Sequence, residues 1–302
     1  MKVIWMNGGL GNQLFQYIFY RFVEIVSGDD CYIDDRFFTT TKAHNGYEIE
    51  RIFGLKPKLL KERFSPKEWE EIVEESKNRV NIIPCLASRG LKLLPFSEGN
   101  FFAERYSKHT VQYKGPVYSI PANQYVPDTG TIEGDVYFHG YWINAHWFQY
   151  IRDEIMDELV FPSALPHDTY TQHMIERIDG SHSIGVHVRR GDFVTLGWAM
   201  DFSWYATRIP AMRKFIRNPV FFLFSDDLIW CKENFASLGF LPSDEVVFID
   251  GNTGANSYRD LQLLSHCQNM IIANSSFSYL AALLNQRPNK YILNPSEARE
   301  IL

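Results

Sequence analysis

The sequence has few cysteines, and their spacing excludes two kinds of site. Four occur among the 302 residues, Cys31, Cys85, Cys231 and Cys267, and no two of them form a Cys-x-x-Cys pair. A structural zinc site needs ligands at short spacing, and a disulfide framework needs a denser set of cysteines. We therefore expect free thiols in a reducing compartment.

Long apolar runs and basic runs are also missing. The first six residues are followed at once by a polar, glycine-rich stretch, so the apolar start is too short for a signal peptide or a membrane span. The net charge is −6 and no cluster of lysine and arginine stands out, which argues against a nucleic-acid partner. We expect a cytoplasmic protein with a small-molecule partner, whose only membrane contact would be peripheral, at the inner face, with a lipid-carried substrate.

Two nucleotide motifs are absent from the glycine-rich turn near the amino terminus. The turn is Asn7-Gly8-Gly9-Leu10-Gly11-Asn12-Gln13, between a predicted strand at 3–6 and a predicted helix at 14–26. Its spacing is neither Gly-x-Gly-x-x-Gly nor a P-loop, so dinucleotide or ATP binding is not indicated. The glycines allow a ligand to approach the backbone, and we expect the amides of Asn12 and Gln13 to face it. The alternative is a tight turn that only packs the helix on the strand.

The rest of the chain is typical of a large α/β protein. It is 45% hydrophobic and 15% aromatic, and its length favours two domains, which we place at 1–170 and 171–302. In the first we expect further strands at 31–34 and 135–142 and helices at 66–77 and 145–159. The first of these helices has a capping box, with Ser65 as N-cap, Pro66 at the first helical position and Glu68 three residues after the cap.

The second domain alternates strands and helices regularly. The predicted strands are 184–188, 220–224, 245–250 and 270–273, and the predicted helices are 204–216, 229–238, 259–267 and 279–284. Apolar strands in such alternation form a parallel sheet covered on both faces. The carboxyl ends of these strands should therefore meet at one edge of the sheet.

Polar residues follow each of these strands, and ligands of open α/β sheets bind at that edge. They are His187, Arg189, Arg190, Asp192, Ser225, Asp226, Asp227, Asp250, Asn252, Asn274, Ser275, Ser276 and Ser278. Arginines beside hydroxyls at a helix start suit a diphosphate, and a carboxylate can read guanine or a ribose hydroxyl. No Asp-x-Asp magnesium motif occurs. The alternatives are a structural Arg–Asp pair, and helix caps at Asp226 and Ser276.

Four motifs in register carry a family resemblance. They are Gly8-Gly9-Leu10-Gly11-Asn12-Gln13-Leu14-Phe15-Gln16-Tyr17, His187-Val188-Arg189-Arg190-Gly191-Asp192, Phe224-Ser225-Asp226-Asp227 with Trp230, and Asp260 to Cys267 running on to Asn274-Ser275-Ser276-Phe277-Ser278. Together they resemble the alpha-1,2-fucosyltransferases of glycosyltransferase family 11. The resemblance implies an α/β, GT-B-like fold with two Rossmann-type domains facing a cleft, the first on the acceptor side and the second binding GDP-L-fucose. It also implies inverting transfer, without a metal or cofactor, to the 2-hydroxyl of a galactose-terminated glycan.

The resemblance assigns roles to individual residues. Arg189 would stabilise the β-phosphate, and Asn12 would lie near the anomeric carbon. The remaining donor-binding residues would be His187, Arg190, Asp192, Ser225, Asp226, Asp227, Asn274, Ser275, Ser276 and Phe277, with Asp192 orienting the arginines and Asp227, or else Asp226, reading guanine. Neither His139, which we interpret as a core or edge-strand residue, nor Glu133 is assigned as the base. Transfer to another glycan position or to a protein, and an idle GDP-sugar-binding module, remain the alternatives.

Overall fold

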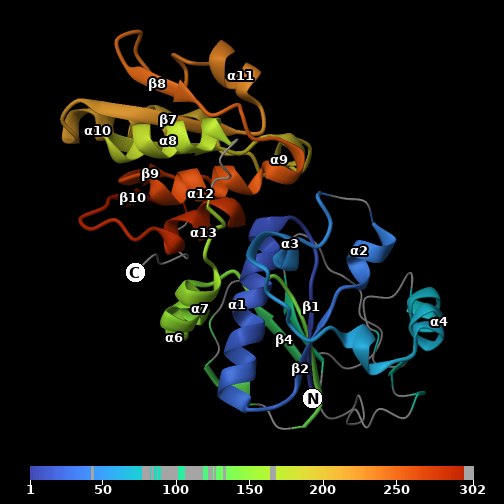
Figure 1. Ribbon diagram of the computed structural model, residues 1–302. Coiled ribbons are helices and arrows are strands. Elements are labelled where there is room, and N and C mark those ends of the chain that lie inside the picture. The colour runs from blue at the N-terminus through green and yellow to red at the C-terminus, as the bar shows by residue number, and fades with distance from the viewer. Residues whose placement is uncertain are drawn as a thin grey trace. The chain divides into compact units, whose positions relative to one another are not determined.

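The protein comprises two compact units in a computed structural model, Met1–Val160 and Phe161–Leu302. The structure describes residues 1–41, 44–76, 82, 85–86, 88–89, 101–105, 118–121, 125, 127–131, 134–163 and 168–295 (Figure 1). The units divide after Val160, upstream of the boundary at residue 170 expected from the sequence. A division at 170 would cut through helix α8 (Thr169–Asp179), which belongs wholly to the second unit.

Unit 1 is built on a five-stranded parallel sheet of order β2-β1-β5-β3-β4. Its strands are β1 (Lys2–Trp5), β2 (Cys31–Asp34), β3 (Phe101–Arg105), β4 (Tyr118–Pro121) and β5 (Val136–His139). The predicted strands at 3–6 and 31–34 are confirmed. The strand predicted at 135–142 is shorter, because the chain leaves the sheet after His139 and Trp142 takes a positive φ of 56°.

Helix α1 (Leu10–Ser27) begins inside the glycine-rich turn, earlier than the predicted start at residue 14. Gly9 is its extended N-cap residue and makes no side-chain cap, so no polar capping signal marks this start. The helix buries apolar side chains such as Leu14, Phe15 and Ile18, as the spacing predicted. Gly28 ends it in the left-handed conformation, at φ 67°.

The remaining helices of unit 1 are short. They are α2 (Arg36–Thr40), α3 (Ile49–Phe53), η1 (Leu60–Arg63), α4 (Pro66–Ser76), η3 (Pro127–Thr131), α6 (Ala145–Tyr150) and α7 (Arg152–Glu158). The capping box is confirmed, since the N–H of Ser65 donates to Glu68 Oε2 over 2.9 Å and the N–H of Glu68 to Ser65 Oγ over 3.4 Å. The single helix predicted at 145–159 is two, because Ile151 breaks it at φ −125° and ψ 35°.

Unit 2 contains a second five-stranded parallel sheet, of order β10-β9-β6-β7-β8. Its strands are β6 (His182–Val188), β7 (Pro219–Ser225), β8 (Glu245–Phe248), β9 (Asn269–Ile271) and β10 (Ile292–Leu293). Four of these confirm predicted strands. Strand β10 was not predicted, since two residues carry no periodicity.

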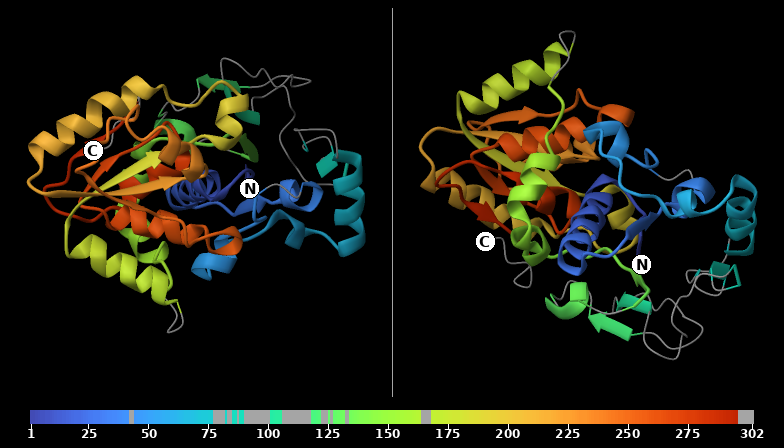
Figure 2. Two further views of the ribbon diagram at one scale, coloured as in Figure 1. Left: turned by 90° about the horizontal axis from the view of Figure 1, so that it is seen from above. Right: turned by 60° about the horizontal axis from the view of Figure 1, so that its bottom comes forward.

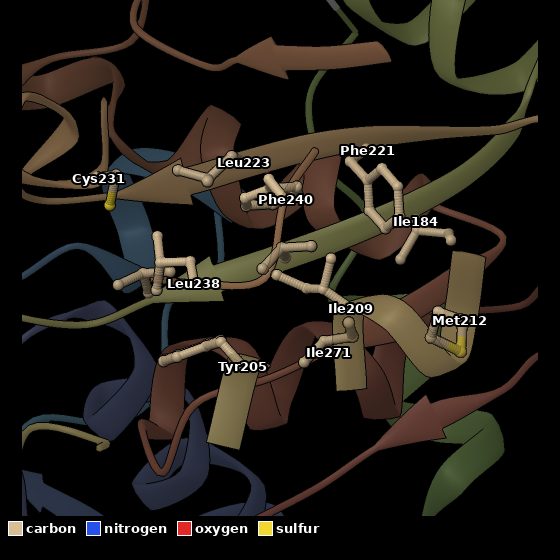
Figure 3. Close-up of a cluster of buried hydrophobic side chains, with 12 residues drawn as sticks. Ile184, Tyr205, Ile209, Met212, Phe221, Leu223, Cys231, Leu238, Phe240 and Ile271 are labelled. Atoms are coloured by element: carbon tan, nitrogen blue, oxygen red, sulfur yellow. The ribbon is translucent and has the colours of Figure 1, made fainter. Parts of the chain in front are cut away.

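Helices cover both faces of this sheet, with α10 (Phe202–Phe215) on one face and α8 and α12 (Tyr258–His266) on the other (Figure 2). Shorter helices connect the strands, namely α9 (Gly191–Thr195), α11 (Leu228–Glu233), η4 (Gly254–Asn256) and α13 (Ser276–Leu284). Tyr205, Ile209 and Met212 of α10 pack against β6 and β7 in the buried cluster shown in Figure 3. This packing fixes the two strands that carry most of the predicted site.

All four cysteines are buried and carry free thiols. Burial raises the pKa of the Cys31 thiol to about 12, which keeps it protonated and unreactive at neutral pH. Within the described ranges, no helix combines the length and apolar character that crossing a membrane requires.

Candidate functional site

The centre of the site is a crossed arrangement of two arginines and two aspartates at the carboxyl edge of the unit 2 sheet. Val188 of β6 is in register with Ser225 of β7, so the residues that follow each strand lie side by side. The Arg189 Nη1 pairs with Asp226 Oδ2 over 2.8 Å, and the Arg190 N–H donates to Asp226 Oδ1 over 2.8 Å. The Arg190 Nε–H donates to Asp227 Oδ2 over 3.4 Å. The structure thus brings together four of the predicted site residues.

A third carboxylate joins this group through the short helix α9. Asp192 Oδ1 accepts from Arg189 Nη2 over 2.5 Å. Gly191, at φ 20°, makes the arrangement sterically possible, because a Cβ there would lie 2.5 Å from Asp226 Oδ2. Two guanidinium groups are therefore balanced by three carboxylates before any ligand is bound.

Asp227 and Ser225 stabilise the turn that follows β7 at this edge. Asp227 Oδ1 accepts from the N–H of Trp230 and caps α11, so the cap is Asp227 and not Asp226, the residue considered for it from the sequence. Ser225 Oγ accepts from the Asp227 N–H over 3.0 Å. The hydroxyl and both carboxylates thus bond to protein atoms at the turn after β7, which shapes the turn.

His187 is a neutral imidazole at this edge. Burial, with a smaller effect from the Arg189 charge, lowers its pKa to about 3. Its ring lies 5.7 Å from that of Phe277, and its Nδ1 is buried with no hydrogen-bond partner among the described residues. The imidazole is therefore neutral at neutral pH and cannot offer a ligand a positive charge.

The segment after β9 completes the edge. Ser275 Oγ accepts from the Phe277 N–H over 3.3 Å and is the N-cap of α13, so Ser276 is the first helical residue and not the cap. The Asn274 amide donates to the Trp198 carbonyl over 2.9 Å, which ties this segment to the loop after α9. β9 pairs with β6 and β6 with β7, so all predicted donor-binding residues lie at the carboxyl ends of three adjacent strands of one sheet.

Asn12, the other predicted catalytic residue, belongs to unit 1. It lies in the first turn of α1, against Gly8, where a Cβ would be 2.6 Å from the Asn12 Nδ2. Gln13 does not face a ligand as expected. Its buried side chain donates to the carbonyls of Gly8 and Gly46 and accepts from the Glu48 N–H, because those backbone groups need partners in the interior.

The two candidates for a general base have different outcomes. His139 is a core residue, as interpreted from the sequence: it is buried and stacks on Trp5 with ring centres 3.9 Å apart. Burial, with a smaller effect from the Arg36 charge, lowers its pKa to about 3. Glu133 lies outside the described residues.

Two residues near the edge were not assigned a role from the sequence. Trp230 contacts Arg190, with the guanidinium carbon 3.4 Å from the ring centre. Asp260 at the start of α12 accepts from the Asn252 amide over 2.9 Å, and burial raises its pKa to about 7. Nothing in the sequence around Trp230 predicts its contact with Arg190. The acidic Asp260 on the apolar helix predicted at 259–267 was a usable signal for a buried carboxylate.

Metal ligands do not gather in the part of the chain that the structure describes. No group of three or more His, Cys, Asp or Glu side chains there could hold an ion. The cations at the edge are the two arginines.

Open α/β sheets bind ligands at the carboxyl ends of their strands, and arginines suit phosphate oxygens. The sequence profile of glycosyl transferase family 11 matches residues 112–301, more than half of the chain. The chain therefore belongs to this family and is a glycosyltransferase, which confirms the resemblance seen in the sequence.

Several characterised relatives match the chain. An alpha-1,2-colitosyltransferase of Escherichia coli is 28% identical over 92% of this chain and 86% of its own length. A galactoside 2-alpha-L-fucosyltransferase of Bos taurus, SEC1, is 27% identical over 51% of this chain and 44% of its own length. The chain thus spans less than half of that mammalian enzyme.

Solved structures share the fold. The fucosyltransferase NodZ from Bradyrhizobium matches 100% of this chain and 96% of its own, with a TM-score of 0.53 and 15% identity. NodZ soaked with GDP-fucose, described as an alpha-1,6-fucosyltransferase, has a TM-score of 0.50, 16% identity and coverage of 94% and 91%. The prediction of a GT-B-type α/β fold with parallel sheets is confirmed.

Proposed function

We propose that the protein transfers L-fucose from GDP-L-fucose to the 2-hydroxyl of a galactose-terminated glycan. The family supports the reaction class, and the alpha-1,2 linkage in the names of both relatives supports the position. The observation that carries the proposal is the arginine pair at the carboxyl edge of β6, next to the hydroxyls of the α13 start. That edge suits a nucleoside diphosphate.

Arg189 is the residue that we assign to the β-phosphate. As the bond to fucose breaks, negative charge grows on that phosphate, and a fixed cation stabilises the charge. The Arg189 side chain is 27% exposed and already bonds to two carboxylates. A phosphate oxygen would either replace one of these carboxylates or bind to the guanidinium beside them. Arg190 would support the same diphosphate, with Asp192 keeping Arg189 in place.

The remaining donor contacts follow from the chemistry of the edge. Ser276 and the N–H groups at the start of α13 would bond to phosphate oxygens, with Ser275 and Asn274 shaping that turn. Phe277 and the neutral His187 would flank the base or ribose. Asp227, or else Asp226, would accept a hydrogen bond from guanine. Each of these carboxylates already bonds to an arginine, and the second lone pair of the bonded oxygen would serve guanine.

Asn12 would bind close to the anomeric carbon and the acceptor hydroxyl. The transfer would invert that carbon and need no metal, because fixed arginines and N–H groups stabilise the leaving diphosphate and the chain has no Asp-x-Asp sequence. A cytoplasmic enzyme that meets its acceptor at the inner face of the membrane is consistent with this chemistry.

The decisive experiment measures GDP release from GDP-L-fucose in EDTA, with and without lactose or a type 1 disaccharide. We expect release that depends on the acceptor and a product with an alpha-1,2 linkage; an α-linked product from the β-linked donor establishes inversion. GDP binding without transfer would indicate an idle module. An activity that requires added metal would refute the metal-free chemistry.

A second donor sugar is favoured by one comparison. A relative that aligns over most of both chains is a colitosyltransferase, and colitose is L-fucose without its 3-hydroxyl. GDP-colitose should therefore be tested beside GDP-L-fucose at equal concentrations. The donor with the higher kcat/KM is the one that the site selects.

A further inference from the structure

Trp230 has no role in the proposed reaction, although it touches one of the donor-site arginines. The Arg190 guanidinium carbon lies 3.4 Å from the centre of the Trp230 ring. Phe202 stacks on the same indole, with ring centres 5.0 Å apart and planes inclined by 20°. A guanidinium over an indole is held by cation–π attraction and by stacking of the two planar groups. Trp230 therefore restrains the plane of the Arg190 side chain.

Hydrogen bonds restrain Arg190 at two further points. Its Nε–H donates to Asp227 Oδ2, while Asp227 Oδ1 accepts from the Trp230 N–H over 3.1 Å. Its backbone N–H donates to Asp226 Oδ1 over 2.8 Å. Asp227 thus links the two partners of the stack, and Arg190 is fixed at its backbone, its Nε and its ring-facing surface.

The terminal amino groups of Arg190 remain for a ligand. No hydrogen bond joins Nη1 or Nη2 of Arg190 to any residue that the structure describes, and its side chain is 18% exposed. Arg189 differs, since its Nη1 and Nη2 pair with Asp226 and Asp192. A guanidinium whose orientation is fixed and whose two amino groups point to no protein acceptor is arranged to bind an oxyanion through two bonds.

We propose that Trp230, supported by Phe202, is a positioning residue that orients Arg190 toward the diphosphate of the donor. This rests on the function proposed above, because it takes the anion to be that of a GDP-sugar. Trp230 acts through Arg190 and does not touch the substrate. Restraining the arginine before the ligand arrives lowers the entropy that binding must remove, which strengthens donor binding.

Calorimetric titration with GDP tests this proposal. We expect Trp230→Leu to weaken GDP binding about 3- to 30-fold, the range of a partly desolvated cation–π contact. Trp230→Phe keeps a ring face and should stay within about 3-fold of the wild type. The Arg190→Ala, Trp230→Leu double variant should bind GDP no more weakly than Arg190→Ala alone. Losses that multiply in the double variant, or an unaltered affinity in Trp230→Leu, would overturn the proposal.

A matched control is available in the same unit. The Lys232 ammonium lies 5.0 Å from the centre of the Phe248 ring, so Phe248→Leu removes a comparable contact that does not involve either site arginine. GDP affinity should not change in this variant. Phe202→Leu, at a half-exposed position, serves if Trp230→Leu does not fold, and it should weaken GDP binding in the same direction by a smaller factor. An unchanged affinity there would count against the stack.

A measurement without ligand separates this proposal from the proposed function. The indole ring current shifts the NMR signal of the Arg190 Nε–H, so in unliganded protein Trp230→Leu should move this signal and Phe248→Leu should not. An unmoved signal in Trp230→Leu would show that the tryptophan does not position the arginine. A wild-type protein that binds no GDP would refute the proposed donor, while the NMR shift would still decide the positioning role.

Discussion

Each unit has an arginine–aspartate pair at the carboxyl edge of its sheet, and the two pairs differ in how completely they are closed. In unit 1, Arg36 and Asp34 have side chains that are 8% and 0% exposed. Asp34 accepts from the Arg36 Nε and Nη2 and from the Tyr137 hydroxyl, the last over 2.7 Å. In unit 2, Arg189 and Asp226 are each 27% exposed, and Arg189 divides its bonds between two carboxylates.

The difference distinguishes a structural ion pair from one that can bind a ligand. A buried pair whose hydrogen bonds are satisfied internally offers no place to an outside anion, and breaking it strands a charge in the interior. A partly exposed arginine between two carboxylates can be reached from solvent by a phosphate. Similar residues at similar positions would therefore serve stability in unit 1 and, under the function proposed above, recognition in unit 2.

The largest expected effect is on the closed pair. Arg36→Met should lower the free energy of unfolding by about 3–5 kcal/mol, because Asp34 is left buried without its counter-ion. Urea unfolding measures the loss. The matched control is Arg177→Met, which removes an exposed pair with Glu245 (2.8 Å) and should cost less than about 1 kcal/mol. Equal losses in the two variants would contradict the distinction between closed and open pairs.

The open pair should show the opposite pattern. Arg189→Ala is expected to slow acceptor-dependent GDP release on the order of 10²–10³-fold, the typical cost of losing one donor to a developing oxyanion. Its thermal midpoint should change little, because the pair is partly exposed. Steady-state rates and thermal unfolding on the same sample measure both. Near-normal transfer by a folded variant would remove Arg189 from the β-phosphate.

The buried carboxylate of Asp260 makes the stability of unit 2 depend on pH. The pKa of Asp260 is about 7 in the folded protein, raised by burial above the value near 4 of an unfolded chain. The folded state therefore holds a proton that the unfolded chain has lost, and this group makes stability fall as pH rises from about 4 to 7. Asp260→Asn should remove that fall, so its advantage over the wild type is greater at pH 8 than at pH 5, by at most about 3 kcal/mol.

Thermal unfolding at the two pH values gives the sign of this effect. Asp179→Asn is the control, because Asp179 is an exposed carboxylate paired with Arg287. A variant that loses stability at pH 8 relative to the wild type would mean that Asp260 is ionised and stabilising in the folded protein.

The sequence predicted the course of the chain through the site but not the partners within it. The composition of apolar segments such as 220–224 predicts buried strands, and the polar residues at the ends of these strands lie at one edge of the sheet. The partner of a side chain depends on register between strands that are distant in sequence. Arg190 and Trp230 are 40 positions apart, and no local pattern brings them together.

Local geometry accounts for the remaining differences. Helix α1 begins at Leu10 because glycine can precede a helix without a side-chain cap, and the sequence offers no polar residue to mark the start. The caps fall on Asp227 and Ser275, each one residue from the position considered, because Asp226 is drawn to the arginines and Ser276 is already helical. Adjacent polar residues of one kind cannot be separated by pattern alone.

The smallest effects separate a cap from a ligand in unit 2. Ser275→Ala should cost about 1 kcal/mol of stability, since the Phe277 N–H loses its acceptor. Ser276→Ala should raise the KM for the GDP-sugar several-fold, about the net value of one hydrogen bond. Unfolding and steady-state kinetics on both variants give the two readouts. If Ser275→Ala instead raised KM without loss of stability, the Ser275 hydroxyl, which caps α13 here, would bond to the donor in the complex. The donor-binding hydroxyl would then be that of Ser275 and not that of Ser276.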